Sequence, residues 1–191
     1  MNRQENELRE RRCCRLILLE DTRQQASKHT LKHKYFEEHG VDWRRQALYV
    51  GDYTLPTDQS ICIDTKKDLQ EVVMNVCGAE HERFRDECIR ARDAGIKLIV
   101  LVEEDQTDEN GSYVVNDIRD VWKWKNPRLD VYVYRTVDGQ RKKVRKYPKA
   151  TTGTTLMKAM LTMQKKYDVE FQFCRKKDAG KRIMEILRLE E

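Results

Sequence analysis

The sequence predicts an α/β fold in which a mixed β-sheet carries helices on both faces. Short apolar runs typical of strands alternate along the chain with segments of helical periodicity. The run 96–102 is almost wholly apolar, as expected for a central parallel strand that is covered on both faces. With 191 residues, the chain fits one domain and is long enough to bury a core.

The first third of the chain predicts three strands and one helix. The apolar run 15–20 indicates a buried strand that brings Asp21 to its C-terminal end. Residues 26–39 have the periodicity of a helix, and a glycine follows them. Strands are expected at 43–50 and 60–65, and the short loop between them favours a hairpin.

The remaining elements complete the layers of the fold. The long helical stretch 68–94 is expected to break near Gly78, because glycine interrupts helices. After the apolar strand and a segment of different composition, the chain predicts a helix at 154–167, a strand at 169–173 and a helix at 178–190. These elements return the chain to the pattern of a sheet between helices.

The segment that follows the central strand differs from the rest in composition. An acidic loop covers 103–111, and alternation over 131–147 predicts a β-hairpin that turns at Asp138 and Gly139. We therefore interpret 104–150 as an insertion within a single domain that spans 1–191.

Composition and cysteine usage narrow the class of protein. Charged residues make up 37% of the chain, but the formal net charge is only +5, so partner choice depends on where the basic residues lie. Six cysteines, Cys13 and Cys14 among them, show no Cys-x-x-Cys spacing and are interpreted as reduced core thiols of a cytosolic protein. No apolar stretch approaches the roughly 18 residues of a membrane span. Residues 1–13 lack an apolar signal core and are expected to form a flexible or helical N-terminal extension.

Two carboxylates and one amine surround the predicted hairpin. Asp52 follows a turn at Gly51, and Asp64 and Lys66 lie two residues apart on the next strand, so they project from the same face. Neighbouring carboxylates repel one another unless a cation lies between them, and Mg²⁺ accepts such oxygen ligands. A nearby ammonium can stabilise charge on a phosphate. This pattern indicates a metal-dependent nuclease; the alternative is a hairpin with solvated charges on its outer face.

The order of five segments extends this interpretation. They cover 18–24, 50–53, 63–66, 81–84 and 98–103. In this order and spacing the chain resembles the ERCC4-type nuclease domain of structure-specific endonucleases, which also occurs as a stand-alone domain in phages and bacteria. The resemblance extends from about residue 14 to the C-terminus. It implies a restriction-endonuclease-like fold and a DNA endonuclease that requires Mg²⁺ or Mn²⁺ and acts on branched, flapped or junction-containing DNA.

The resemblance also implies a role for individual residues. Asp52 matches the aspartate of the family's Gly-Asp motif and would be a catalytic metal ligand. Asp64 stands at the glutamate of the family's Glu-Arg-Lys motif as a second ligand, and Lys66 stands at its lysine. Asp21 matches the first-strand aspartate, which contributes an outer carboxylate, and the backbone carbonyl of Thr65 would complete the coordination.

This chain departs from the family pattern at several positions. The glutamate and arginine of Glu-Arg-Lys are replaced by Asp64 and Thr65, and Gln24 stands where the family usually has a glutamate. Asp68 follows the lysine two residues earlier than usual, so we assign it no ligand role. These departures keep two alternatives open: a catalytically inactive DNA-binding relative, and a protein-interaction or regulatory domain of a mobile element.

Contacts to DNA are predicted on the helix that follows the site. Arg83 and Arg85 lie close to the sequence position at which the family has an arginine that supports active-site or phosphate contacts. The alternative is that Arg83 forms an ion pair with Glu87 on a solvated face. His81 is interpreted as a surface histidine rather than a phosphate contact.

The predicted hairpin offers a second set of DNA contacts. Its residues Lys142, Lys143 and Arg145 are predicted to bind DNA, because neutralising phosphates releases counterions. Trp122 and Trp124 either stack on an unpaired base or belong to the core.

The expected partners are DNA and a second protein chain. The family dimerises through the nuclease domain and usually adds a helix-hairpin-helix module, for which this chain, ending at Glu191, has no room. DNA engagement is therefore expected from the domain itself, its insertion, a homodimer mate or another protein. Ile183, Ile186 and Leu187 either form a dimer face or pack on their own sheet. We expect an intracellular, cytoplasmic protein associated with DNA or the nucleoid and not with membranes.

Overall fold

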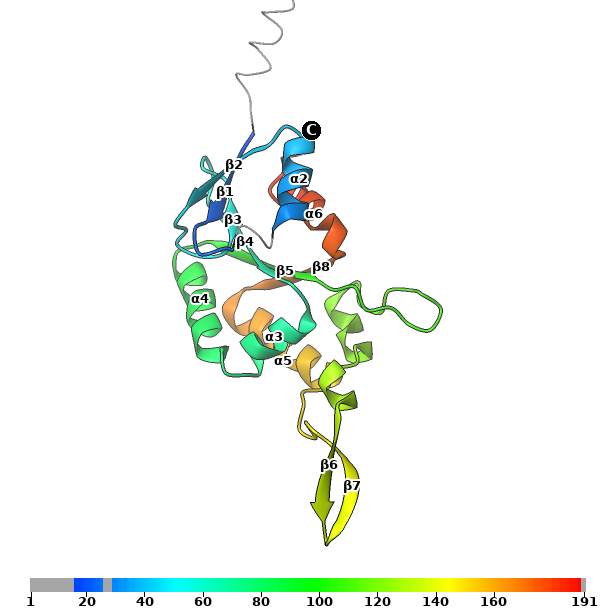
Figure 1. Cartoon of the computed structure of the whole chain (residues 1–191). Helices are drawn as coiled ribbons and strands as arrows, with labels where there is room; N and C mark the ends of the chain where they lie inside the picture. The colour runs from blue at the N-terminus through cyan, green and yellow to red at the C-terminus, as the bar shows by residue number, and fades with distance from the viewer. Residues whose placement is uncertain (1–15, 26–28, 190–191) are drawn as a thin grey trace, which may run out of the picture.

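The structure, a computed structural model, describes residues 16–25 and 29–189. A six-stranded mixed sheet with the strand order β2-β1-β3-β4-β5-β8 forms the centre of the molecule, and helices cover both of its faces (Figure 1). This arrangement confirms the predicted α/β class. The proposed extension 1–13, together with Cys13 and Cys14, lies outside the described residues.

The strands of the sheet run in mixed directions. They are β1 (Ile17–Asp21), β2 (Asp42–Gln46), β3 (Tyr53–Thr54), β4 (Ile61–Lys66), β5 (Lys97–Glu103) and β8 (Glu170–Cys174). The pairs β1·β2, β4·β5 and β5·β8 are parallel, whereas β3 pairs antiparallel with both β1 and β4. Strand β5 is buried along almost its whole length, as its apolar sequence predicts.

Within residues 16–25 and 29–189, two helices cover one face of the sheet and three cover the other. On the first face lie α2 (Thr30–Glu38) and α6 (Ala179–Ile186); on the second lie α3 (Leu69–Val76), α4 (His81–Asp93) and α5 (Gly153–Tyr167) (Figure 1). Each group closes its own hydrophobic core against the sheet. Ile183 and Leu187 are buried in the first core and Ile186 packs against it, so this apolar face packs on the protein's own sheet.

The expected break in the long helical stretch occurs between α3 and α4. A Cβ atom at Gly78 would lie 2.9 Å from the Cα of Met74, so the backbone there approaches too closely for a side chain. The break at this glycine is therefore confirmed.

The predicted pairing of 43–50 with 60–65 is wrong. Strand β2 ends at Gln46 and pairs in parallel with β1 at the edge of the sheet, and the short strand β3 pairs with β4 instead. The intervening chain turns at Gly51, whose φ of 71° and close approach to the carbonyl oxygen of Ile63 both favour glycine. This turn places Asp52 immediately before β3, and its backbone N–H donates to the Ile63 carbonyl at 2.7 Å.

The segment after β5 contains two short 3₁₀ helices, η2 (Ile118–Lys123) and η3 (Pro127–Asp130), and the hairpin of β6 (Tyr132–Val137) and β7 (Gln140–Arg145). The hairpin turns at Asp138 and Gly139, both with positive φ, as predicted. It projects away from the six-stranded sheet (Figure 1). The interpretation of 104–150 as an insertion stays a prediction.

The described cysteines, Cys62, Cys77, Cys88 and Cys174, are free thiols. Cys62 and Cys88 are buried as expected, whereas Cys77 is exposed, so the predicted core position is wrong for this residue. Burial raises the pKa of the Cys88 thiol to about 12, which keeps it protonated at neutral pH. No helix in the described ranges is both long and apolar enough to cross a bilayer.

The first turn of α5 packs closely against η2, and this contact gives a test of the fold. A Cβ atom at Gly153 would lie 2.6 Å from the carbonyl oxygen of Trp124, a backbone atom that cannot rotate away. We expect Gly153→Ala to lower the free energy of unfolding by about 1–3 kcal/mol in urea denaturation. The adjacent exposed Thr154→Ala should change it by less than about 0.5 kcal/mol. Equal stability of the two variants would contradict the packing described here.

Candidate active site

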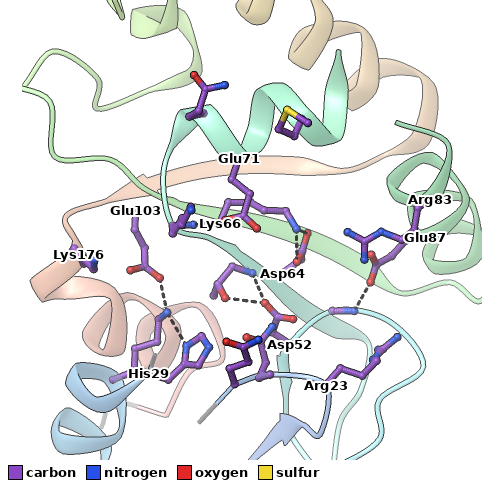
Figure 2. A pocket seen from close by; sticks show the side chains of 18 of the residues that line it. Arg23, His29, Asp52, Asp64, Lys66, Glu71, Arg83, Glu87, Glu103 and Lys176 are labelled. Carbon is purple, nitrogen blue, oxygen red and sulfur yellow. Dashed lines mark hydrogen bonds and ion pairs between the residues drawn. The ribbon is translucent and has the colours of Figure 1, made fainter. Parts of the chain in front are cut away.

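A pocket of about 780 Å³ opens beside the end of β4 (Figure 2). Five of the sequence-predicted residues line it: the proposed metal and catalytic residues Asp52, Asp64, Thr65 and Lys66, and the proposed DNA contact Arg83. Asp52 comes from the turn before β3, and Asp64, Thr65 and Lys66 come from β4, the antiparallel neighbour of β3 in the sheet. The structure therefore brings together the two carboxylates and the amine that the sequence analysis singled out, Asp52, Asp64 and Lys66.

Asp52 is held against β4 by its own side chain. Its Oδ2 accepts hydrogen bonds from the backbone N–H and the hydroxyl of Thr65, both at 2.7 Å. Its Oδ1 accepts no hydrogen bond from the described residues. One oxygen thus fixes the orientation of the carboxylate and the other remains for a ligand in the pocket.

Asp64 and Lys66 form a buried ion pair on one face of β4. The Nζ of Lys66 lies 2.8 Å from Asp64 Oδ1 and 2.7 Å from Oδ2, and both side chains are more than nine-tenths buried. The Oδ2 of Asp64 still lacks a directed hydrogen bond. Strand alternation explains the pairing, because residues two apart project from the same face.

The surroundings raise the pKa values of both Asp64 and Lys66. Burial raises the pKa of the Asp64 carboxyl, and the nearby carboxylates of Asp52 and Glu87 raise it further. Burial alone would lower the pKa of the Lys66 ammonium, but the carboxylates of Asp64 and Asp52 outweigh burial and raise it. Lys66 is therefore protonated at neutral pH, and Asp64 lies close to two further carboxylates, those of Asp52 and Glu87.

Glu87 is a pocket residue that the sequence analysis did not assign to the site. It lies on α4, and its Oε1 accepts a hydrogen bond from the backbone N–H of Gly51 at 3.0 Å. Figure 2 shows its carboxylate on the same side of the pocket as those of Asp52 and Asp64. A signal existed in the sequence: Glu87 is three residues after Phe84, which faces the core, so it flanks the buried side of the helix.

The donor set fits a divalent cation of the Mg²⁺ type. Asp52 and Asp64 each offer a carboxylate oxygen without a directed hydrogen bond from the described residues, and repulsion among the three carboxylates would be relieved by a cation. Across the described ranges, no group of three or more His, Cys, Asp or Glu side chains is arranged to hold a metal alone. Mg²⁺ is commonly held by one or two carboxylates together with substrate phosphates and water, and Asp52 and Asp64 supply two such carboxylates.

Asp21 lies outside the pocket lining and has other partners. Its Oδ1 accepts hydrogen bonds from the backbone N–H and from Nε of Arg23. Its Oδ2 accepts two further hydrogen bonds, from Nη2 of Arg23 and from the backbone N–H of Leu48, each at 2.8 Å. Burial would raise the pKa of Asp21, but these hydrogen bonds outweigh burial and lower it. The carboxylate joins the end of β1 to the chain that leads into the site, and its role as a metal ligand stays a prediction.

The predicted arginines of α4 have different surroundings. Arg83 lines the pocket and is exposed, and its Nε pairs with Glu80 at 2.9 Å. The alternative pairing of Arg83 with Glu87 is therefore wrong, because Glu87 faces Gly51. Arg85 pairs with Asp86 and does not line the pocket.

The hairpin residues predicted to bind DNA are exposed but lie away from the pocket. Lys142, Lys143 and Arg145 all belong to β7, and none of them lines the pocket. The two tryptophans differ: Trp124 is buried in the core, whereas Trp122 is 56% exposed.

The far end of the pocket carries residues that the sequence analysis did not assign to the site. Lys32 of α2 is buried and forms an ion pair with Glu103. Its Nζ lies 3.2 Å from Nδ1 of His29. Burial and the charge of Lys32 lower the pKa of His29. Lys176 lies at the same end of the pocket as Glu103 and His29 (Figure 2), and Arg128 also lines the pocket. A lysine within a helical pattern gives no signal that it will be buried against a strand end.

Comparisons with known proteins identify a family and a fold. The ERCC4 domain family matches residues 20–186. The structure of XPF from Aeropyrum pernix is similar with a TM-score of 0.55 and 16% identity, covering 91% of this chain and 64% of that chain. XPF from the same organism in complex with DNA is similar with a TM-score of 0.55 and 15% identity, covering 92% and 64%. No curated protein matches the chain. The chain thus spans less than two thirds of the length of these XPF chains, and the likeness supports the fold.

Proposed function

Since the chain belongs to the ERCC4 domain family, we propose that it is a metal-dependent DNA endonuclease that hydrolyses phosphodiester bonds in branched, flapped or junction-containing DNA. The observation that carries the proposal is the convergence of Asp52, Asp64 and Lys66 in one pocket. The similarity to an XPF structure in complex with DNA supports DNA as the partner. The intracellular setting that this substrate requires is part of the same proposal.

Asp52 and Asp64 would hold Mg²⁺ or Mn²⁺ in this pocket, together with the backbone carbonyl of Thr65. A cation held there supplies Lewis-acid polarisation of the scissile phosphate and lowers the pKa of water. Thr65 contributes a second function, because its N–H and hydroxyl orient the Asp52 carboxylate. Glu87 accepts a hydrogen bond from the backbone N–H of Gly51 and thereby helps to hold the turn that carries Asp52.

Lys66 acts in this proposal as a cationic hydrogen-bond donor. Its raised pKa keeps the amine protonated, so it cannot serve as a general base near neutral pH. Its Nζ instead stabilises negative charge that develops on the phosphate oxygens. In the structure described here Nζ is engaged by Asp64, so a phosphate must share this donor with the carboxylate.

Basic residues around the pocket would bind the rest of the substrate. Arg23 and Arg83 lie at the rim and are exposed, which suits contacts with phosphates flanking the scissile bond. Lys142, Lys143 and Arg145 on the hairpin would bind the DNA backbone farther away. A homodimer mate or a protein partner would extend this surface further.

The proposal is tested by incubating the protein with labelled fork, flap, four-way-junction and plain duplex DNA in Mg²⁺, Mn²⁺ or EDTA. We expect cleavage of the branched substrates near the branch point, little cleavage of the plain duplex, and none in EDTA. Product mapping on a sequencing gel gives the position and polarity of the cut. Absence of cleavage from every substrate with either metal would refute the nuclease assignment.

A non-cleaving DNA-binding relative is the second candidate, and the replacement of the family's glutamate and arginine by Asp64 and Thr65 favours it. It predicts salt-sensitive binding of the same substrates without hydrolysis in either metal. Absence of both cleavage and binding would favour a regulatory or protein-interaction role instead.

A further inference from the structure

The hairpin of β6 and β7 carries the whole formal net charge of the chain. Residues 132–146 contain six lysines and arginines and one aspartate, a net charge of +5, which equals the net charge of all 191 residues. The remaining residues are therefore balanced in charge. Such a concentration of charge on a projecting two-stranded ribbon suits a polyanionic partner (Figure 1).

One face of the hairpin combines these charges with aromatic rings. The register pairs Tyr132 with Arg145 and Tyr134 with Lys143, and cross-strand partners share a face. Lys143 Nζ lies 4.9 Å from the ring centroid of Tyr132, and the Arg141 guanidinium lies 5.1 Å from that of Tyr134. Tyr134 remains 63% exposed and Tyr132 44% exposed. We call these two residues the tyrosine pair.

A basic and aromatic path joins the hairpin to the pocket. Arg128 lines the pocket, and its guanidinium lies 5.6 Å from the ring centroid of Tyr147, just beyond the hairpin. Lys146 Nζ lies 5.2 Å from the same ring. These contacts connect the pocket lining at Arg128 through Tyr147 to Lys146, the residue that follows β7.

We propose that the tyrosine pair binds an unpaired DNA strand by base stacking, while the lysines and arginines beside it hold the phosphates. Bases in a duplex present only their edges in the grooves, whereas unpaired bases present flat faces that stack on exposed aromatic rings. The inference rests on the proposed function and makes it more specific: the preferred substrate carries a single-stranded arm that extends from the pocket along the hairpin.

A structural role for the rings is the competing explanation. Cation–aromatic pairs across two strands stabilise a hairpin, and an isolated hairpin is only marginally stable. The two roles differ in their effect on DNA binding. Loss of stacking weakens binding of unpaired strands selectively, whereas loss of hairpin structure weakens binding of single strands and duplexes alike.

The test measures DNA binding in EDTA by fluorescence anisotropy, with labelled oligothymidylate and a blunt duplex as probes. Replacing both members of the tyrosine pair by leucine, as Tyr132→Leu with Tyr134→Leu, should weaken oligothymidylate binding by roughly tenfold or more and duplex binding by less than about threefold. The matched control, Tyr132→Phe with Tyr134→Phe, keeps both rings and should stay within about twofold of wild type.

Three results would overturn the inference: an equal loss on both probes, no loss on oligothymidylate, or no measurable binding of oligothymidylate by the wild type. Because binding in EDTA requires no hydrolysis, the result is separable from the proposed function. A protein that shows ring-dependent binding but never cleaves would refute the nuclease and retain the tyrosine pair. A protein that cleaves branched DNA but binds single strands independently of the rings would do the reverse.

Discussion

Asp52→Asn is expected to lower the rate of cleavage by at least about 100-fold while leaving the fold intact. The amide oxygen of asparagine can still accept the two hydrogen bonds from Thr65, so the turn before β3 should keep its geometry. The substitution removes one of the charges that would hold the cation. Single-turnover cleavage of a labelled fork in Mg²⁺ measures the loss, and DNA binding in EDTA should stay within about threefold of wild type.

The same variant has a thermal signature that is independent of activity. Removing the Asp52 charge relieves its repulsion of Asp64, so without metal the melting temperature should equal or exceed that of wild type. The rise in melting temperature that Mn²⁺ produces in the wild type should be lost. Asp58→Asn is the matched control, because it removes one exposed aspartate charge outside the pocket and should preserve both properties. Full cleavage by Asp52→Asn would remove this residue from the site.

Lys66→Met is expected to abolish measurable cleavage and also to destabilise the protein. The substitution leaves the buried Asp64 carboxylate without its only ion-pair partner among the described residues, close to Asp52 and Glu87. Breaking a buried pair in this way costs about 3–5 kcal/mol. Urea denaturation at neutral pH measures the change, and Lys67→Met, which removes the adjacent exposed lysine, should leave stability unchanged.

The sign of the pH dependence follows from the raised pKa of Asp64. When the folded protein has the higher pKa, it binds more protons than the unfolded chain at pH values between the two pKa values. The free energy of unfolding therefore falls as pH rises from the unfolded value of 3.8 toward the raised folded value. Without Lys66 this window should widen toward higher pH.

A double variant separates the two effects of Lys66. Adding Asp64→Asn to Lys66→Met removes the stranded carboxylate, so most of the lost stability should return while cleavage stays absent. If the double variant remained as unstable as Lys66→Met, the destabilisation would have another cause, such as lost packing of the lysine stem against Phe84, over whose ring Nζ lies at 5.4 Å.

Much of the fold was predictable because it depends on short-range patterns. The wholly apolar stretch of β5 required burial on both faces, and Gly78 interrupted a helical pattern at the point where its backbone approaches Met74. Asp138 and Gly139 predicted the turn of the β6–β7 hairpin. The error concerned strand pairing, since nothing in the local pattern of 43–50 distinguishes an edge strand parallel to β1 from one arm of a hairpin.

In the candidate site, too, the features that depend on local sequence were predicted and those that depend on long-range contacts were not. Asp64 and Lys66 were expected on one face of a strand, because strand alternation holds in any fold. Glu87 was not assigned to the site, because its contact joins it to the backbone of Gly51, 36 residues earlier in the chain. The partners of Asp21 were also unforeseen, since the approach of Leu48 depends on how the chain returns from β2.

By itself, the sequence determined the alternation of strands and helices, the placement of Asp64 beside Lys66, and the concentration of positive charge on one hairpin. Only the tertiary structure decided which carboxylates share a pocket, that Asp21 is engaged by the backbone of Leu48, and that Lys32 is buried beside Glu103. The physical reason is one of range. Side-chain direction along a strand follows from backbone geometry over two residues, whereas a pocket depends on the packing of segments that are distant in the chain.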